Sequence, residues 1–130
     1  MYLLDSDIIV EYLRGNKVFV DKLISLSYEN LYTTTISLAE LFYGIYASSK
    51  PEYNTQKLMD FLLNVKILNI NLNSCKLFGK IKSSLKRSGK LIDNFDLLIA
   101  GVCITNNLIL ITNNEKHFER IDGLKILNLK

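Results

Sequence analysis

Short apolar segments alternate along the chain with longer segments in which apolar residues recur every three or four positions. The nearly continuous apolar run at 108–112 is typical of a central strand that is covered on both faces. We predict strands at 2–4, 31–34, 66–70, 108–112 and 125–127, and helices at 8–13, 18–26, 37–48, 51–64, 74–87 and from 94 onward. This alternation predicts an α/β fold, with a central parallel sheet flanked by helices.

The stretch 91–101 is the one around which this arrangement is organised. Residues 97–104 are apolar on nearly every side, so a helix here must be buried all round. Asp93 is placed to cap this helix, and Asp96 falls at its third position, where free N–H groups and the helix dipole favour carboxylates. The local pattern leaves two roles open for these acids: they could cap the helix, or they could help to hold a cation at its N-terminus.

Other acidic and amide side chains follow the predicted strands. Asp5 comes directly after the first strand, Glu40 lies one turn into the helix after the second, and Asn114 follows the central strand. Because ligands of parallel sheets bind outside the carboxyl ends of the strands, these residues and the two acids of the buried helix are predicted to meet at one edge. Ser37 and Glu40 also fit a capping box, which is the alternative role of Glu40.

This set of oxygen ligands suits Mg²⁺ or Mn²⁺. Three carboxylates that converge without a cation repel one another and raise a pKa, so the cluster makes electrostatic sense mainly with metal bound. One or two such ions can activate water and stabilise the attacking and leaving oxygens when a phosphodiester is cleaved.

Other chemistries lack the residues that they need. His117 is the single histidine and follows no patterned Ser or Cys, so we predict a surface or core-edge residue with little contact to substrate. The same shortage of His and Cys disfavours zinc. Gly79 and Gly89 are isolated, and no phosphate-binding glycine loop is present.

Length and composition indicate one globular domain. The chain has 130 residues, of which 48% are hydrophobic and 22% charged. No apolar run is long enough to span a membrane, and no export signal is visible at the N-terminus. Cys75 and Cys103 lack metal-type spacing and fall in apolar helical patterns, so we predict reduced core thiols in a cytoplasmic protein.

Positive charge is concentrated in one segment. Residues 61–92 contain no Asp or Glu but seven Lys or Arg residues, and the net charge of the chain is +3. In the helix predicted at 74–87, Lys76, Lys80 and Arg87 form one stripe beside the apolar arc. Such a stripe indicates either contact with a polyanion, which here would be the RNA backbone, or a solvated face.

Several ordered blocks together resemble the PIN-domain family, specifically endoribonuclease toxins of the VapC type. The blocks are 2–8, 37–44, 96–100, 110–114, 118–121 and 123–124, so the resemblance spans nearly the whole chain. It implies a PIN-like three-layer fold and a ribonuclease that depends on Mg²⁺ or Mn²⁺. It also implies a cognate antitoxin as partner and a homodimer.

The resemblance assigns the family's first three acids to Asp5, Glu40 and Asp96. Asp5 and Asp96 would ligate metal directly, and Glu40 would complete the ligand shell or orient the attacking water. The fourth family position is often Asp; here it is Asn114, which would bind metal weakly and which removes a charge from any second metal site. Three further residues are expected in the outer shell: Ser6, Asp7 and Asp93.

Our leading hypothesis is therefore a single-domain, metal-dependent endoribonuclease, the toxin of a toxin–antitoxin pair. One alternative is a catalytically weak or inactive PIN-like module that binds RNA or protein, which the neutral Asn114 keeps open. Another is a PIN nuclease that acts in RNA maturation or on DNA.

Overall fold

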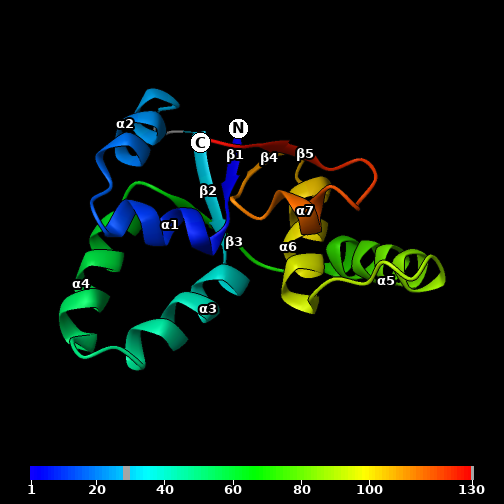
Figure 1. Ribbon diagram of the computed structural model, residues 1–130, viewed down its shortest axis with the longest axis horizontal. Helices are drawn as coiled ribbons and strands as arrows, with labels where there is room; N and C mark the ends of the chain where they lie inside the picture. Colours follow the sequence, from blue (N-terminus) through cyan, green and yellow to red (C-terminus); the bar gives the residue numbers. More distant parts are fainter. Residues whose placement is uncertain (28–29, 130) are drawn as a thin grey trace.

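A five-stranded, fully parallel sheet forms the centre of the computed structural model, which describes residues 1–27 and 30–129 (Figure 1). The strands are β1 (Tyr2–Leu4), β2 (Leu31–Thr34), β3 (Lys66–Leu68), β4 (Ile109–Ile111) and β5 (Lys125–Leu127). Their spatial order is β3-β2-β1-β4-β5. The chain thus builds outward from β1 in one direction and then crosses to its other side, so the order reverses between β1 and β4. The predicted α/β fold with a central parallel sheet is confirmed.

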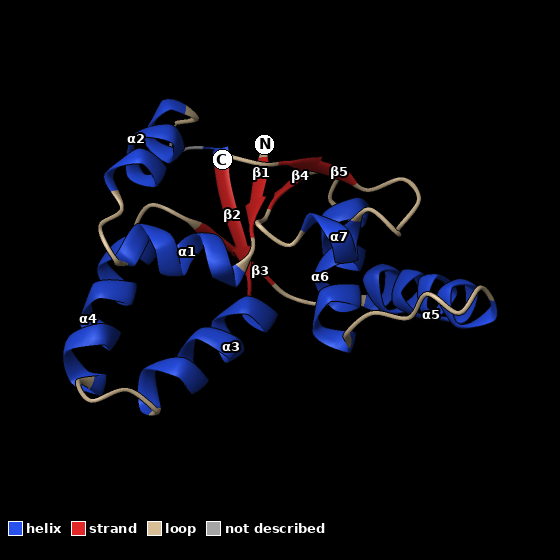
Figure 2. Ribbon diagram, in the orientation of Figure 1, coloured by secondary structure: helices blue, strands red, loops and turns tan. Residues whose placement is uncertain are grey.

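Helices cover both faces of the sheet (Figure 2). They are α1 (Ser6–Leu13), α2 (Lys17–Ser25), α3 (Thr35–Tyr46), α4 (Pro51–Leu62), α5 (Leu72–Arg87), α6 (Asn94–Thr105) and α7 (Glu115–Phe118). Figure 1 shows α1–α4 on one side of the sheet and α5–α7 on the other. Among the described residues, no helix has the length and apolarity that crossing a membrane requires.

Two hydrophobic cores result from the alternation of side chains along the strands. Leu4 and Ile111 point into the core formed with α1–α4, whereas their neighbours Leu3 and Leu110 point into the core formed with α5–α7. All four are fully buried, because consecutive side chains of a strand face opposite sides of the sheet. Continuous apolar runs in β1 and β4 are therefore what central strands of a three-layer fold need.

The buried helix α6 begins as the sequence predicts. Asp93 is its N-cap and accepts a hydrogen bond from the backbone N–H of Phe95 at 3.1 Å, while Asp96 lies in the first turn. Five of its apolar side chains are buried: Leu97, Ile99, Ala100, Val102 and Cys103. Burial raises the pKa of the Cys103 thiol to about 12, as expected for an inert core cysteine.

Four details of the sequence prediction are wrong. Cys75 is exposed, because α5 is buried along one face only and Cys75 lies outside that face. Strand β3 ends at Leu68 rather than at 70, and β4 spans 109–111 rather than 108–112. The capping box is also absent: α3 starts at Thr35, and its N-cap Thr34 accepts the N–H of Ser37 at 3.0 Å. Glu40 is consequently free for another partner.

Gly101 allows α5 and α6 to approach each other closely. A Cβ atom at this position would lie 2.9 Å from the backbone oxygen of Ser74, whereas one at Gly79 in α5 would meet no atom within 4 Å. We expect Gly101→Ala to lower the free energy of unfolding by about 1–3 kcal/mol, as overpacking does. Gly79→Ala, the control, should raise it by roughly 0.5–1 kcal/mol through helix propensity. Urea denaturation measures both, and equal effects of the two substitutions would contradict the packing argument.

Candidate active site

The candidate site lies where the strand order reverses. Asp5 directly follows β1, and Thr112 directly follows the neighbouring β4. The Thr112 hydroxyl donates to Oδ2 of Asp5 at 2.8 Å, and the Asp5 backbone N–H donates to the Ile111 carbonyl oxygen at 3.0 Å. Asp5 is only 5% exposed. Its carboxylate is thus fixed in the crevice at the carboxyl ends of the strands, the usual ligand site of such sheets.

Ser6 connects Asp5 to Glu40. The Ser6 backbone N–H donates to Oδ1 of Asp5 at 2.8 Å, and its hydroxyl donates to Oε1 of Glu40 at 3.4 Å. Asp5 thereby caps α1, while Glu40 reaches the site from α3. The acid that sequence analysis also assigned to a capping box instead contacts Ser6, the residue after the first acid of the chain.

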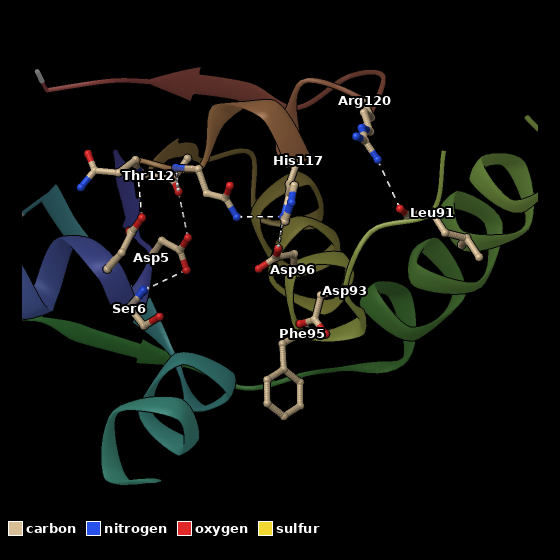
Figure 3. Close-up of polar contacts among 12 residues, drawn as sticks. Asp5, Ser6, Leu91, Asp93, Phe95, Asp96, Thr112, His117 and Arg120 are labelled. Carbon is tan, nitrogen blue, oxygen red and sulfur yellow. Dashed lines mark hydrogen bonds and ion pairs between the residues drawn. The ribbon is translucent and has the colours of Figure 1, made fainter. Parts of the chain in front are cut away.

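His117 connects Asn114 to Asp96. Its Nδ1 lies 2.9 Å from Nδ2 of Asn114 and 3.1 Å from Oδ2 of Asp96 (Figure 3). Asn114 is tied back to the strand end, because its backbone N–H donates to the Thr112 hydroxyl at 3.0 Å. The side chains from α6 and from the loop after β4 therefore form one unit.

These residues make one connected series of polar contacts, in which the single Nδ1 of His117 donates to Asp96 or accepts from Asn114, depending on its tautomer. It runs from Glu40 through Ser6, Asp5, Thr112, Asn114 and His117 to Asp96. Four segments that are distant in the sequence supply the members: residues 5–6, α3, α6 and residues 112–117. The four residues expected to bind metal are all in this series.

The remaining expected outer-shell residues lie beside it. Oδ2 of Asp7 accepts a hydrogen bond from the Asn113 backbone N–H at 3.0 Å, which holds the loop after β4. Its other oxygen, Oδ1, is buried without a hydrogen-bond partner among the described residues. Asp93 is exposed at the α6 N-terminus, where its charge still acts on Glu40 and Asp96.

The site concentrates carboxylates that resist ionisation. Burial, reinforced by the negative charge of Asp7, raises the pKa of Asp5 from 3.8 to about 7. Burial is also the largest cause that raises the pKa values of Asp7, Glu40 and Asp96. The hydrogen bond from His117 opposes the shift at Asp96, and that from Ser6 opposes it at Glu40. Such a cluster gains stability from any cation that neutralises it.

The donor set fits a hard divalent cation. The side chains offer carboxylate and amide oxygens, which Mg²⁺ and Mn²⁺ prefer, and the unpartnered oxygen of Asp7 leaves acceptor capacity beside them. Across residues 1–27 and 30–129, no three His, Cys, Asp or Glu side chains form a preassembled metal cluster. Mg²⁺ commonly binds through one or two carboxylates and keeps several waters, so this spacing is compatible with such an ion.

Sequence reasoning missed two members of the series, Thr112 and His117. His117 lies at the surface as predicted, with its side chain 43% exposed, but it also touches two site residues, which sequence reasoning did not foresee. Its spacing of three residues from Asn114, on one helical turn, was the available signal. Thr112 gave a weaker signal, as the polar residue that ends an apolar strand.

The predicted RNA-contacting residues lie apart from the carboxylates. Lys76, Lys80 and Arg87 are exposed on α5, and in the described part of the chain none forms an ion pair or hydrogen bond with a site acid. A cavity of about 380 Å³ instead adjoins the site between α1, α3 and α4, with Ser6 and Glu40 in its lining.

Comparisons with known proteins identify the family. The family model for the PIN domain matches residues 2–124. The chain belongs to the PIN-domain family. It is 32% identical over 127 residues to ribonuclease VapC2 of Haemophilus influenzae. The aligned region covers 98% of this chain and 96% of that relative. The chain is 29% identical over 124 residues to the tRNA(fMet)-specific endonuclease VapC of Shigella flexneri, with 95% and 94% covered.

A solved PIN-domain structure confirms the fold. The crystal structure of VapBC2 from Rickettsia felis bound to a DNA fragment from their promoter contains a chain that matches with a TM-score of 0.90 and 35% identity. The match covers 98% of this chain and 97% of that one. The predicted PIN-like fold and the VapC-type resemblance are thus confirmed.

The raised pKa of Asp5 predicts how stability depends on pH. Between pH 3.8 and about 7 the folded chain holds a proton on Asp5 that the unfolded chain releases, so the metal-free protein should lose stability as pH rises through this window. Asp5→Asn should flatten that decline, because the amide does not titrate. Urea midpoints measured across the window in EDTA test this, and parallel curves for both proteins would contradict it.

Proposed function

We propose that this chain is a metal-dependent endoribonuclease that hydrolyses RNA phosphodiester bonds as the toxin of a toxin–antitoxin pair. The observation that supports it most is the connected series that joins Asp5, Glu40, Asp96 and Asn114 at the carboxyl edge of the sheet. Its relatives in H. influenzae and S. flexneri are named as a ribonuclease and as a tRNA-specific endonuclease. The proposal transfers that chemistry to this site.

Asp5 and Asp96 are the residues that would hold Mg²⁺ or Mn²⁺, with Asn114 as a weaker, neutral ligand. When bound, such an ion lowers the pKa of water and neutralises charge on the phosphate that is attacked. With its proton on Nδ1, His117 donates to Asp96 and orients that carboxylate. Thr112 does the same for Asp5.

Glu40 is placed to receive a proton. Its pKa is raised by burial and by the charge of Asp96, and a carboxylate with a raised pKa is a better base near neutral pH. In the proposed reaction Glu40 orients the attacking water and accepts its proton as the water oxygen bonds to phosphorus. The bond between phosphorus and the leaving ribose oxygen then breaks, and that oxygen takes a proton from water, so that one water is consumed in total.

The basic face of α5 would attract the RNA. An acidic site repels phosphate, so the attraction has to come from charge placed elsewhere. Lys76, Lys80 and Arg87 supply exposed positive charge on a helix that packs against α6, the helix that carries Asp96. We therefore assign the contact with the RNA backbone to this face.

We also propose an antitoxin protein as a partner. Support comes from the matched chain of R. felis, which was solved as VapBC2 on promoter DNA. The homodimer stays a prediction of the family resemblance.

A second candidate is a PIN-like module that binds RNA without cutting it. Two observations favour it: the fourth ligand position is the neutral Asn114, and no three site side chains in the described part of the chain form a preassembled metal cluster. Cleavage assays in Mn²⁺ and in EDTA separate the two functions.

Asp96→Asn tests the proposed nuclease. We expect RNA cleavage in Mn²⁺ to fall by on the order of a hundredfold or more, since even outer-shell substitutions at metal sites cost 10–100-fold. The metal-free variant should be as stable as the wild type or slightly more stable, because a repelling charge is removed. Mn²⁺ should raise the melting temperature of the wild type and much less that of the variant.

Asp21→Asn, at an exposed position on α2, is the matched control and should leave cleavage and the metal response unchanged. Marked destabilisation of metal-free Asp96→Asn would instead make Asp96 a structural cap. A wild type that binds RNA but cuts none in Mn²⁺ would favour the binding module.

Single substitutions to Ala at Lys76, Lys80 and Arg87 test the basic face. For single-stranded RNA, each lost phosphate contact should flatten the slope of log K against log salt by about 0.7. Fluorescence anisotropy with Asp96→Asn as the parent protein measures binding without cleavage. Lys17→Ala on α2, beyond the opposite face of the sheet, should leave the slope unchanged. If all four variants keep the parent slope, the helix is only a solvated face.

A further inference from the structure

An exposed aromatic side chain stands beside the candidate site. Phe95 is 46% exposed, although it belongs to the most buried helix of the chain and directly precedes Asp96. It is a member of neither hydrophobic core, whereas the next residues, Leu97 and Leu98, pack into the core under α6. Leaving so large an apolar side chain half in water forgoes burial worth about 25 cal/mol per Å², so a binding role is worth considering.

The backbone beneath this ring is held firmly. Oδ2 of Asp93 accepts the Phe95 N–H at 3.1 Å, which fixes the first turn of α6. From the other side, the Arg120 guanidinium donates to the carbonyl oxygens of Lys90 and Leu91, at 3.4 and 3.3 Å, in the loop that leads into α6. The ring is therefore presented on a fixed support, not on a free loop.

The ring points away from the core. Figure 3 shows Phe95 pointing away from His117 and from the sheet, past the carboxylate of Asp93. No aromatic ring or cation is stacked on it in the described part of the chain. Helix α3, which supplies Glu40, packs next to α6, so the ring borders the space between the helices that carry two of the proposed catalytic acids.

An unpaired nucleobase is the ligand that matches this chemistry. Bases stack on exposed aromatic rings, and each such contact is worth about 1–3 kcal/mol. Stacking is neutral, so it adds binding energy where Asp93, Asp96 and Glu40 repel the phosphate backbone. Phe95 and Asp96 are consecutive in the first turn of α6, and a base is joined to its phosphate through one sugar, so a base on Phe95 keeps its phosphate at the same end of this helix.

We propose that Phe95 is a nucleobase-stacking residue that selects an unpaired nucleotide next to the cleaved phosphate. This inference rests on the proposed ribonuclease function and adds to it a residue that recognises the base beside the cleaved phosphate. Base-paired RNA, whose bases are already stacked on one another, would be a poor substrate.

Substitutions at Phe95 give the first test. Phe95→Ala and Phe95→Leu should both lower kcat/KM on single-stranded RNA by roughly 5- to 150-fold, the range that corresponds to lost stacking, mainly through KM. Phe95→Trp should keep or improve it. Leu keeps an apolar side chain of similar bulk, so it separates stacking from any effect on folding. Tyr53→Ala, at a ring 62% exposed on α4, is the matched control and should leave kcat/KM unchanged.

Abasic substitutions in the RNA give the second test. One abasic nucleotide is placed in turn at each position around the mapped cleavage site. A single position next to the cut should weaken the wild type to the level of Phe95→Ala, while Phe95→Ala should be insensitive to the same change. Wild-type kcat/KM for a fully paired duplex of the same sequence should be lower by a similar factor.

The outcomes separate this inference from the proposed function. Three results would overturn the stacking role and leave the nuclease intact. The kcat/KM of Phe95→Ala could lie within twofold of an active wild type, or that of Phe95→Leu could equal that of Phe95→Trp. The third result is that no abasic position distinguishes the wild type from Phe95→Ala. If the wild type cuts no RNA, the nuclease fails. An abasic scan along the whole RNA, read as binding to Asp96→Asn with and without Phe95→Ala, then still decides whether the ring stacks a base.

Discussion

The hydrogen bond from Thr112 to Asp5 joins the two strands between which the strand order reverses. A carboxyl group buried this deeply is tolerated only where its oxygens are satisfied. Thr112 meets one oxygen and the Ser6 backbone N–H meets the other. The pairing fixes the loop after β1 against the loop after β4, and the other site residues are arranged around that junction. The fold thus positions its most deeply buried carboxyl group by the same contact that holds the two loops together.

The layers of the fold were readable from sequence because they depend on local periodicity. Paired apolar residues such as Leu3–Leu4 and Leu110–Ile111 supply both faces of a central strand, and this pattern is visible without coordinates. The exact ends were less predictable, since Leu108 is apolar and buried but lies outside β4. Cys75 was misjudged because its apolar neighbours obscured the side of α5 on which it falls.

Part of the site could also be predicted from the sequence, because of the strand topology rather than local periodicity. Asp5, Glu40, Asp96 and Asn114 could be assigned to one edge because parallel strands end at the same edge. The role of Glu40 depended on a competition that local sequence does not resolve, between Thr34 and Ser37 as the cap of α3. The Thr34 hydroxyl accepts the backbone N–H of Ser37 and so caps α3. Glu40 is therefore available to accept the hydrogen bond from the Ser6 hydroxyl. His117 could not be placed, because its contacts depend on how closely α7 approaches α6 in space.

A cluster of buried acids is costly to the fold, and its position limits that cost. The raised pKa values of Asp5, Asp7, Glu40 and Asp96 mean that ionisation of each is opposed in the folded chain. Two separate hydrophobic cores, one on each face of the sheet, supply stability without involving the site. The same acids that favour a cation repel a polyanion. In the proposed function, affinity for RNA would therefore come from groups outside the cluster, namely positive charge on α5 and neutral stacking at Phe95, and the carboxylates would be left to bind the metal.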